Sequence, residues 1–195
     1  IIFLKKRLMV KKIAVFSSGR GGNFSNLCDY FSVIKNISVE LLVTNNLDSV
    51  SKKIADINNI DSFYADKSVM LTGKLNKALE ERGIDLIVLA GFIIKIPKVV
   101  ISKYEKKIIN LHPSLLPKFG GKGMYGDNVH KAVLKNNEKF TGITIHYVDE
   151  VYDNGEIIFQ KKCGLALNES LVSLREKIRL LEHEFFPKII ENLLN

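Results

Sequence analysis

The chain lacks any long hydrophobic run, and this absence excludes the membrane-spanning class. None of its apolar stretches approaches the roughly 20 residues that a transmembrane helix needs. Residues 1–4 are apolar, but they are too few for the core of a signal peptide. We therefore expect a cytoplasmic protein with no membrane partner.

Cysteine is scarce as well, and no metal-ligand spacing is present. Cys28 and Cys163 lie far apart without a C-x-x-C pair, and the four histidines are dispersed. We therefore expect no bound metal and two small buried side chains in a reducing compartment. The G-x-S-x-G elbow of serine hydrolases is also missing.

The net charge of +8 does not come from a basic segment. Lysine and arginine are scattered, and no basic run is interleaved with aromatic residues, so no nucleic-acid partner is expected. An excess of lysine suits small anionic substrates equally well. The length of 195 residues, 46% of them hydrophobic, fits one compact domain. We expect this domain to cover residues 9–195, after an N-terminal extension over residues 1–8.

Apolar strands alternate with helical patterns along the chain, which predicts an α/β fold with a doubly wound, mostly parallel sheet and a Rossmann-like N-terminal half. Strands are predicted over residues 13–16, 41–44, 62–64, 86–90 and 108–112. Helical spacing links these strands over residues 24–31, 49–58, 71–79 and 129–133. Residues 143–147 and 156–162 flank a turn, which predicts a hairpin and an antiparallel edge. The spacing over 171–185 predicts a C-terminal helix.

A glycine-rich turn containing Gly21 and Gly22 joins the first strand to the first helix. The unpaired N–H groups at such a helix start can bind a phosphate, and Asn23 can either cap the helix or contact the ligand. Phe24 stands where the dinucleotide fingerprint has its third glycine, and no acidic residue ends the second strand. The pattern favours a monophosphate over a dinucleotide, with a plain tight turn as the alternative.

Asn110 and His112 end the strand that Pro113 terminates, and residues two apart on a strand point to the same side. A carboxamide can donate to a developing oxyanion, and an imidazole can move a proton near neutral pH. The alternative is a capping asparagine beside a packed histidine. Asp153 lies in a predicted turn that is ordinary by itself, but a carboxylate beside His112 would favour the charged ring.

Five motifs occur in order over nearly the whole chain, namely residues 18–23, 89–92, 110–117, 142–148 and 153–155. Together they resemble the folate-dependent formyltransferases. Within that family the chain is most similar to the members that formylate glycinamide ribonucleotide in purine synthesis. Members that act on methionyl-tRNA or hydrolyse formyltetrahydrofolate carry a further domain, for which 195 residues leave no room.

The resemblance implies Asn110, His112 and Asp153 as catalytic residues, a phosphate loop of Gly21, Gly22 and Asn23, and Glu182 as a nucleotide-binding residue. The folate-binding residues that it implies are Ile93, Ile94, Lys95, Ile96, Asn110, Asp149, Glu150, Val151, Tyr152 and Asp153. Ile94 stands where many relatives place arginine. The small-molecule partners are then glycinamide ribonucleotide and a reduced folate, and we expect a monomer or a homodimer.

The resemblance also implies a direct reaction without metal, in which the substrate amine attacks the formyl carbon of 10-formyltetrahydrofolate. Asn110 and a protonated His112 would stabilise the oxygen, while Asp153 would hold His112 charged and help to relay the proton. The alternatives are another folate-dependent formyltransferase or a formyltetrahydrofolate hydrolase, a nucleotide-binding module without chemistry, and a Rossmann oxidoreductase.

Overall fold

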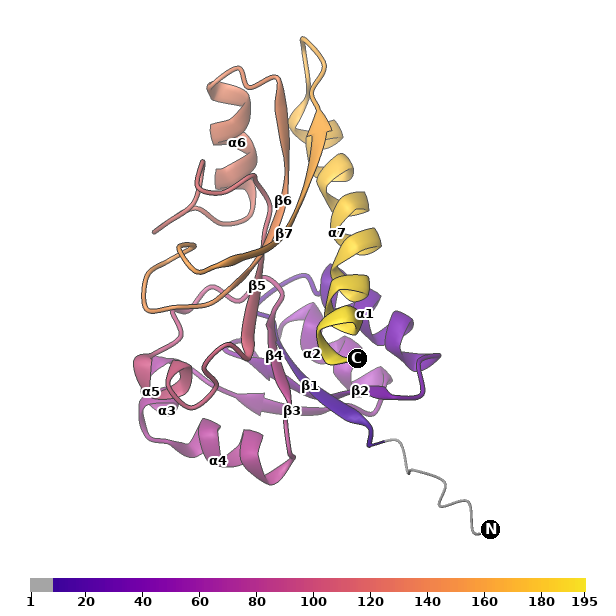
Figure 1. Ribbon diagram of the computed structural model, residues 1–195, viewed down its shortest axis with the longest axis vertical. Helices are drawn as coiled ribbons and strands as arrows, with labels where there is room; N and C mark the ends of the chain where they lie inside the picture. Colours follow the sequence, from indigo (N-terminus) through magenta and orange to yellow (C-terminus); the bar gives the residue numbers. More distant parts are fainter. Residues whose placement is uncertain (1–8) are drawn as a thin grey trace, which may run out of the picture.

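A computed structural model describes residues 9–195, so the expected extension over residues 1–8 lies outside the described residues (Figure 1). The strands are β1 Lys11–Phe16, β2 Ile37–Thr44, β3 Asp61–Tyr64, β4 Leu86–Leu89, β5 Ile108–His112, β6 Phe140–Tyr147 and β7 Ile157–Gly164. The helices are α1 Gly22–Ser32, α2 Val50–Ile57, α3 Lys67–Leu71, α4 Lys74–Glu81, α5 Lys98–Ile101, α6 Asp127–Lys135 and α7 Leu171–Leu194.

The strands form one sheet in the order β3-β2-β1-β4-β5-β6-β7. Neighbours from β3 to β5 are parallel, whereas β6 runs antiparallel to both β5 and β7. The predicted doubly wound sheet with an antiparallel edge and a C-terminal helix is thereby confirmed. Figure 1 shows the β6–β7 hairpin extending away from the parallel strands, with α7 running beside it back toward β1.

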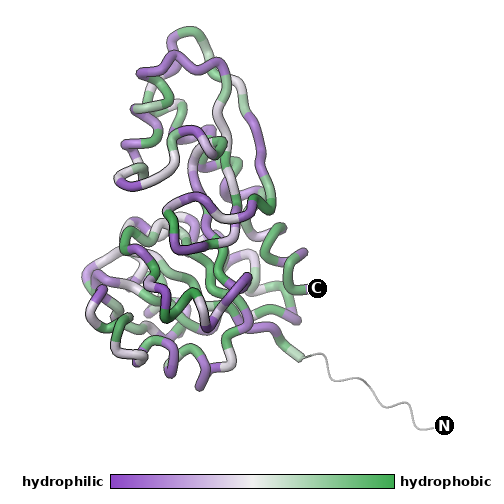
Figure 2. Tube along the Cα trace, turned by 60° about the vertical axis from the view of Figure 1, so that its left-hand side comes forward, coloured by the Kyte–Doolittle hydropathy of each residue, from purple (hydrophilic) through white to green (hydrophobic). Residues whose placement is uncertain are grey.

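Helices cover both faces of the sheet, and each face buries its own set of apolar side chains. Ile13 and Val15 of β1 face α1, α2 and α7, where Phe24, Phe31 and Phe186 are buried. The intervening residues of β1 face α3, α4 and α5. This alternation follows from the two-residue period of a strand. Hydrophobic and hydrophilic residues also alternate along the outer helices (Figure 2).

The predicted helix over residues 71–79 is wrong as one element, because Gly73 interrupts it with a φ of 76°. Asp66 caps α3 by accepting a hydrogen bond from the Val69 backbone N–H, and α4 starts after the glycine. Leu71 therefore ends a short helix and is 58% exposed instead of joining the core. The short helix α5 was not predicted, since four residues after Pro97 carry too little periodicity.

Both cysteines are free; Cys28 is buried in the core as expected, whereas Cys163 is only partly buried. Burial raises the pKa of the Cys28 thiol to about 12, which leaves it an inert apolar side chain. Across residues 9–195, no helix is both long and apolar enough to cross a bilayer.

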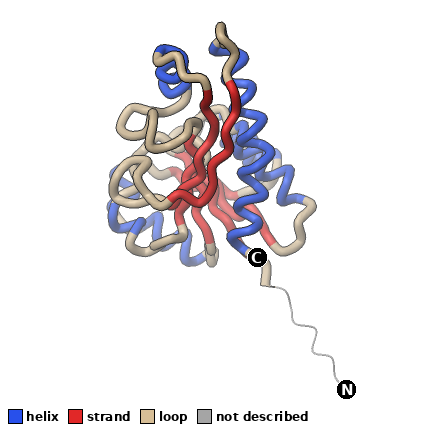
Figure 3. The backbone as a smooth tube through the Cα atoms, turned by 45° about the horizontal axis from the view of Figure 1, so that its top comes forward, coloured by secondary structure: helices blue, strands red, loops and turns tan. Residues whose placement is uncertain are grey.

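The strand order reverses between β1 and β4, and this point positions the candidate site. In doubly wound sheets, ligands bind outside the carboxyl ends of the strands at such a reversal. Here the two loops that leave β1 and β4 are tied together: the Ser18 N–H donates to the Gly91 carbonyl at 3.2 Å, and the Ile93 N–H donates to Ser18 Oγ at 3.1 Å. Loops gather at this end of the sheet in Figure 3.

Candidate active site

A cavity of about 800 Å³ opens at the carboxyl ends of β1, β4 and β5. Among the site residues predicted from the sequence, those that line it are Gly21, Gly22, Asn23, Ile93, Ile94, Lys95, Ile96, Asn110, His112, Asp149, Val151, Tyr152, Asp153 and Glu182. Glu150 does not line it, because its side chain is exposed and pairs with Lys98 at 2.8 Å. Residues predicted from separate motifs thus meet in one cavity.

The glycine turn lies against the N-terminus of α2. Ser51 Oγ contacts Ser17 Oγ at 2.8 Å, and the Ser51 backbone N–H donates to the Gly19 carbonyl at 3.2 Å. Gly21 has a φ of 69°, and an added Cβ would lie 2.9 Å from Ile54 Cδ1. Position 21 therefore accepts only glycine without local rearrangement. No local sequence pattern indicates that Ser51 supports this turn.

Asn23 and Glu182 meet across 159 positions of the chain. Asn23 Nδ2 donates to Glu182 Oε2 at 2.9 Å, and Asn23 Oδ1 is buried without a hydrogen-bond partner within residues 9–195. The helix α1 begins at Gly22 without a side-chain cap, so Asn23 does not cap it. Burial raises the pKa of Glu182 to about 7, against the lowering effects of Asn23 and Arg179.

We expect Glu182→Gln to stabilise the protein at pH 8 but not near pH 5. A carboxyl with a folded pKa of about 7 and an ordinary value of 4.5 makes folding less favourable as pH rises between these values. Glutamine does not titrate and can still accept from Asn23. Thermal denaturation measures the effect as the difference in Tm between variant and wild type.

The matched control for this prediction is Glu184→Gln, an exposed carboxyl on the same helix that pairs with Lys188 at 3.5 Å. Its Tm should differ from wild type by a similar small amount at both pH values. A Glu182→Gln difference that does not grow between pH 5 and pH 8 contradicts a raised pKa at Glu182.

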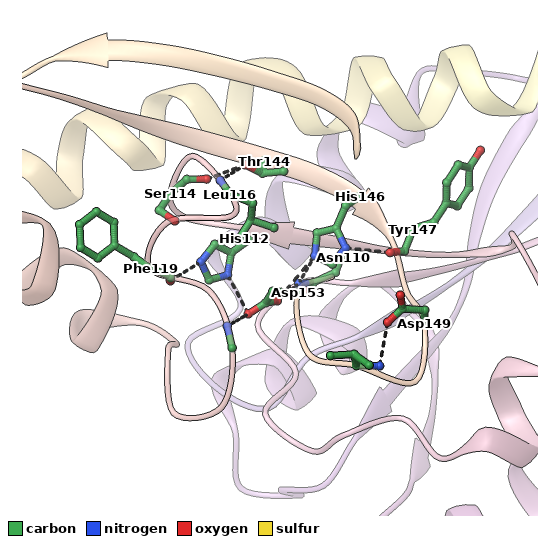
Figure 4. A network of polar contacts seen from close by, with 12 residues as sticks. Asn110, His112, Ser114, Leu116, Phe119, Thr144, His146, Tyr147, Asp149 and Asp153 are labelled. Atoms are coloured by element: carbon green, nitrogen blue, oxygen red, sulfur yellow. Dashed lines mark hydrogen bonds and ion pairs between the residues drawn. The ribbon is translucent and has the colours of Figure 1, made fainter. Parts of the chain in front are cut away.

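Asp153 is the centre of the polar network at the tip of β5 (Figure 4). Its Oδ1 accepts a hydrogen bond from Asn110 Nδ2 at 3.3 Å, and its Oδ2 lies 3.6 Å from His112 Nδ1. The backbone N–H of Gly121 donates to Oδ2 at 2.8 Å, which ties the second glycine-rich loop to the same carboxylate. Burial would raise the pKa of Asp153, but His146, His112 and the Gly121 N–H outweigh burial and lower it. Asp153 is therefore ionised at neutral pH.

His112 is 3% exposed, and both of its ring nitrogens face oxygen atoms. Nε2 lies 2.9 Å from the Phe119 carbonyl, which can only accept, so Nε2 carries a proton. Nδ1 faces Asp153 and is the atom that gains or loses the second proton. A substrate can hydrogen-bond to this ring only by replacing one of these two contacts.

Asp153 favours the charged form of His112, as expected, but burial of the ring outweighs this effect. Burial lowers the pKa of His112 below its ordinary value, and the raising effects of Asp153 and the Phe119 carbonyl do not compensate. The nearby His146 lowers the pKa further. The ring is therefore mainly neutral at neutral pH, and Asp153 reduces the free energy needed to protonate it.

His146 belongs to the same network, although its sequence context predicts only a place in a strand. The register of β5 and β6 pairs it with Asn110, whose Nδ2 lies 3.1 Å from His146 Nε2. His146 Nδ1 lies 2.8 Å from the Tyr147 carbonyl and carries a proton, while Nε2 faces Asn110 Nδ2 and also lies 3.6 Å from Asp153 Oδ1. Both amide hydrogens of Asn110 are thus directed by the protein, and an oxyanion would have to displace one acceptor.

The opposite part of the cavity has apolar walls. Ile93, Ile94 and Ile96 follow β4, and Val151 and Tyr152 come from the connection between β6 and β7. Lys95 Nζ lies 5.3 Å from the centre of the Tyr152 ring, a cation–π contact between the two walls. These walls suit a flat, largely apolar ligand that carries negative charge at one end.

Several further polar residues line the cavity and were not predicted. They are Arg20, Lys122, His130, Arg175, Arg179 and His183. Arg175 joins α7 to α6, because its Nε donates to Asp127 Oδ1 at 2.7 Å and its terminal nitrogen contacts the other oxygen. Within residues 9–195, no group of three or more histidine, cysteine or acidic residues is arranged to hold a metal ion.

The profile of the formyl transferase family matches residues 11–190. The chain belongs to this family. The phosphoribosylglycinamide formyltransferase of Bacillus subtilis (strain 168) is 35% identical over 191 residues, which cover 95% of each chain. The chloroplastic enzyme of that name from Arabidopsis thaliana is 37% identical over 92% of this chain. The chain spans only 64% of that plant relative's length.

Solved structures give the same relationship. Glycinamide ribonucleotide transformylase 1 from Geobacillus kaustophilus superposes with a TM-score of 0.86 at 34% identity, over 95% of this chain and all of that chain. Phosphoribosylglycinamide formyltransferase from Bacillus halodurans gives a TM-score of 0.85 at 31% identity, over 95% and 96% of the two chains. The formyltransferase fold expected from the resemblance is thereby confirmed.

Proposed function

We propose that this chain transfers the formyl group of 10-formyltetrahydrofolate to the amino group of glycinamide ribonucleotide, in purine synthesis. The observation that carries the proposal is one cavity that joins the glycine turn after β1 to Asn110, His112 and Asp153. The names of the relatives from Bacillus subtilis and Geobacillus kaustophilus point to the same reaction.

The two substrates fit the two parts of the cavity by their chemistry. The nucleotide phosphate would bind the backbone N–H groups of Gly21, Gly22 and Asn23 at the start of α1. The folate ring would lie between the apolar walls formed by residues 93–96 and 149–153. A volume of about 800 Å³ is ample for two small molecules placed end to end.

Asn110, His112 and Asp153 then act at the junction of the two parts. As the amine nitrogen bonds to the formyl carbon, the formyl oxygen gains negative charge, which the Asn110 amide and the His112 ring stabilise. Asp153 stabilises the charged form of His112 through Nδ1. The carbon–nitrogen bond to the folate breaks, and the proton lost by the amine passes to the folate nitrogen with help from Asp153.

No step of this reaction needs a metal or a redox partner, and the partners that it requires are two small molecules. A monomer or homodimer and a cytoplasmic location stay predictions from the sequence.

The reaction can be tested directly with purified protein, 10-formyltetrahydrofolate and glycinamide ribonucleotide, without added metal or nicotinamide. We expect tetrahydrofolate and the formylated nucleotide to appear in equal amounts, followed by folate absorbance and by chromatography of the nucleotide. Folate turnover that does not depend on the nucleotide would indicate a hydrolase. Failure to bind folate would indicate a nucleotide-binding module without chemistry.

We expect Gly22→Val to raise the KM for glycinamide ribonucleotide about tenfold or more while the KM for folate changes little. Gly22 is exposed, and an added Cβ would approach only His183 Nε2, at 3.9 Å, so the fold should tolerate valine. The branched side chain would cover the N–H groups that the phosphate needs. Steady-state kinetics with each substrate varied in turn measure the difference.

Gly164→Val is the matched control, because Gly164 ends β7 away from the cavity and also has open space around its Cβ. It should leave both KM values near wild type. Equal effects of Gly22→Val on both substrates would instead indicate that the turn has only a structural role.

A further inference from the structure

His130 is a cavity residue that belongs to none of the motifs found in the sequence. It lies on α6, directly after the glycine-rich loop that Gly121 ties to Asp153. The residue is 7% exposed and lines the cavity together with Arg20 and His112. A buried imidazole at this place is either a packed side chain or a group kept for a ligand.

His130 Nδ1 is buried and has no hydrogen-bond partner within residues 9–195. Buried polar side chains in folded proteins nearly always have a partner, so a ring nitrogen without one is an exception that needs a cause. A leucine or phenylalanine would fill the same space without that cost. The ring is therefore best explained by a partner that arrives with the ligand.

The attachment of α6 to the rest of the protein does not explain why position 130 carries an imidazole. The ion pair of Asp127 and Arg175 already fastens α6 to α7, and Val129 and Val133 are buried under the helix. His130 adds no hydrogen bond to this attachment.

The charges that act on His130 come from both ends of the proposed nucleotide site. Burial lowers its pKa, Asp127 opposes that shift, and the positive charges of Arg175, Arg20 and His112 add to it. Arg20 lies in the phosphate turn and His112 in the catalytic network, so His130 is within electrostatic range of both. A neutral imidazole offers one donor and one acceptor, which suits an uncharged hydroxyl or amide better than a phosphate.

We propose that His130 binds the uncharged part of the ribonucleotide that lies between its phosphate and its amine, namely a ribose hydroxyl or the glycinamide linkage. This inference rests on the proposed function. It assigns His130 to substrate binding and not to the chemical step, so its loss should act on KM for the nucleotide and leave kcat largely intact.

The test compares His130→Leu and His130→Gln with wild type and with Lys131→Ala, a control on the exposed side of the same helix. Calorimetry gives the Kd of glycinamide ribonucleotide and of ribose 5-phosphate, and kinetics give kcat and both KM values. We expect leucine to raise the nucleotide Kd and KM about threefold to tenfold, as loss of one neutral hydrogen bond does. Glutamine should recover most of the affinity, and the folate KM should stay within twofold.

The two ligands separate the possible contacts. Weaker binding of both ligands to His130→Leu assigns the contact to the ribose, and weaker binding of the full nucleotide alone assigns it to the glycinamide. Unchanged Kd values, or a glutamine variant as weak as leucine, overturn the inference while wild-type turnover keeps the proposed function. A wild-type protein that neither binds nor formylates the nucleotide overturns both.

A measurement on the wild-type protein tests the inference even if the His130→Leu variant does not fold. In the 15N-labelled protein, one ring nitrogen signal of His130 should shift when glycinamide ribonucleotide is added, and His130→Gln identifies that signal by its loss. Ring signals that do not respond to saturating nucleotide overturn the inference.

Discussion

Alanine at Asn110 or at His112 is expected to lower kcat by on the order of a hundredfold or more, with smaller changes in either KM. Both side chains lie at the tip of β5, where Asp153 contacts each of them. Donors directed at a developing oxyanion act mainly in the transition state, and removing one of them costs a factor of this order. Steady-state kinetics of the purified variants measure the effect.

Two controls distinguish a loss of catalysis from a loss of folding. Circular dichroism and thermal denaturation should show both variants folded, because neither residue contributes a large apolar side chain to the core. Asn136→Ala removes a comparable amide at the exposed end of α6 and should leave kcat unchanged. A folded Asn110→Ala or His112→Ala variant with near-wild-type turnover would contradict the assignment of the catalytic residues.

The arrangement of the sheet and the position of the site could be predicted from the sequence, because both follow from short-range patterns. The apolar runs at residues 13–16 and 86–90 indicate strands covered on both faces, and strands of a parallel sheet end at one edge. The two-residue period of a strand then places Asn110 and His112 on one side.

Features that depend on strand register or on contacts between distant elements could not be predicted. His146 joins the network only because β6 pairs antiparallel with β5 in the register that sets it opposite Asn110. Glu182 approaches Asn23 only because α7 runs back along the sheet to α1. Neither register nor helix placement is encoded in a local pattern.

The protonation state of His112 also could not be predicted from the sequence, because it depends on a balance of energies in the folded protein. A neighbouring carboxylate raises the pKa of an imidazole and burial lowers it, so the net direction depends on how deeply the ring is enclosed. At 3% exposure, burial outweighs Asp153. His112 is thus mainly neutral next to an ionised Asp153.

Asp153→Asn is expected to lower kcat by on the order of a hundredfold or more, although asparagine has nearly the same shape. Asp153 has a φ of 53°, a conformation that asparagine tolerates better than most other non-glycine residues, so the local backbone should be kept. The variant keeps an acceptor for the Gly121 N–H but loses the negative charge beside His112. Glu156→Gln, a surface carboxyl that pairs with Lys106 at 3.1 Å, is the matched control for loss of charge and should retain full activity.

The same variant should change the titration of His112 in a defined direction. Asp153 opposes the lowering of the His112 pKa by burial, so its neutralisation should lower that pKa further. In NMR titrations of ring-labelled protein, His112 of the Asp153→Asn variant should therefore become charged only at a lower pH than in wild type. In the Glu156→Gln control, His112 should titrate at the same pH as in wild type. If His112 titrates at the same pH in Asp153→Asn and wild type, the carboxylate does not stabilise the imidazolium, and a loss of kcat in that variant must come from its contact with Asn110.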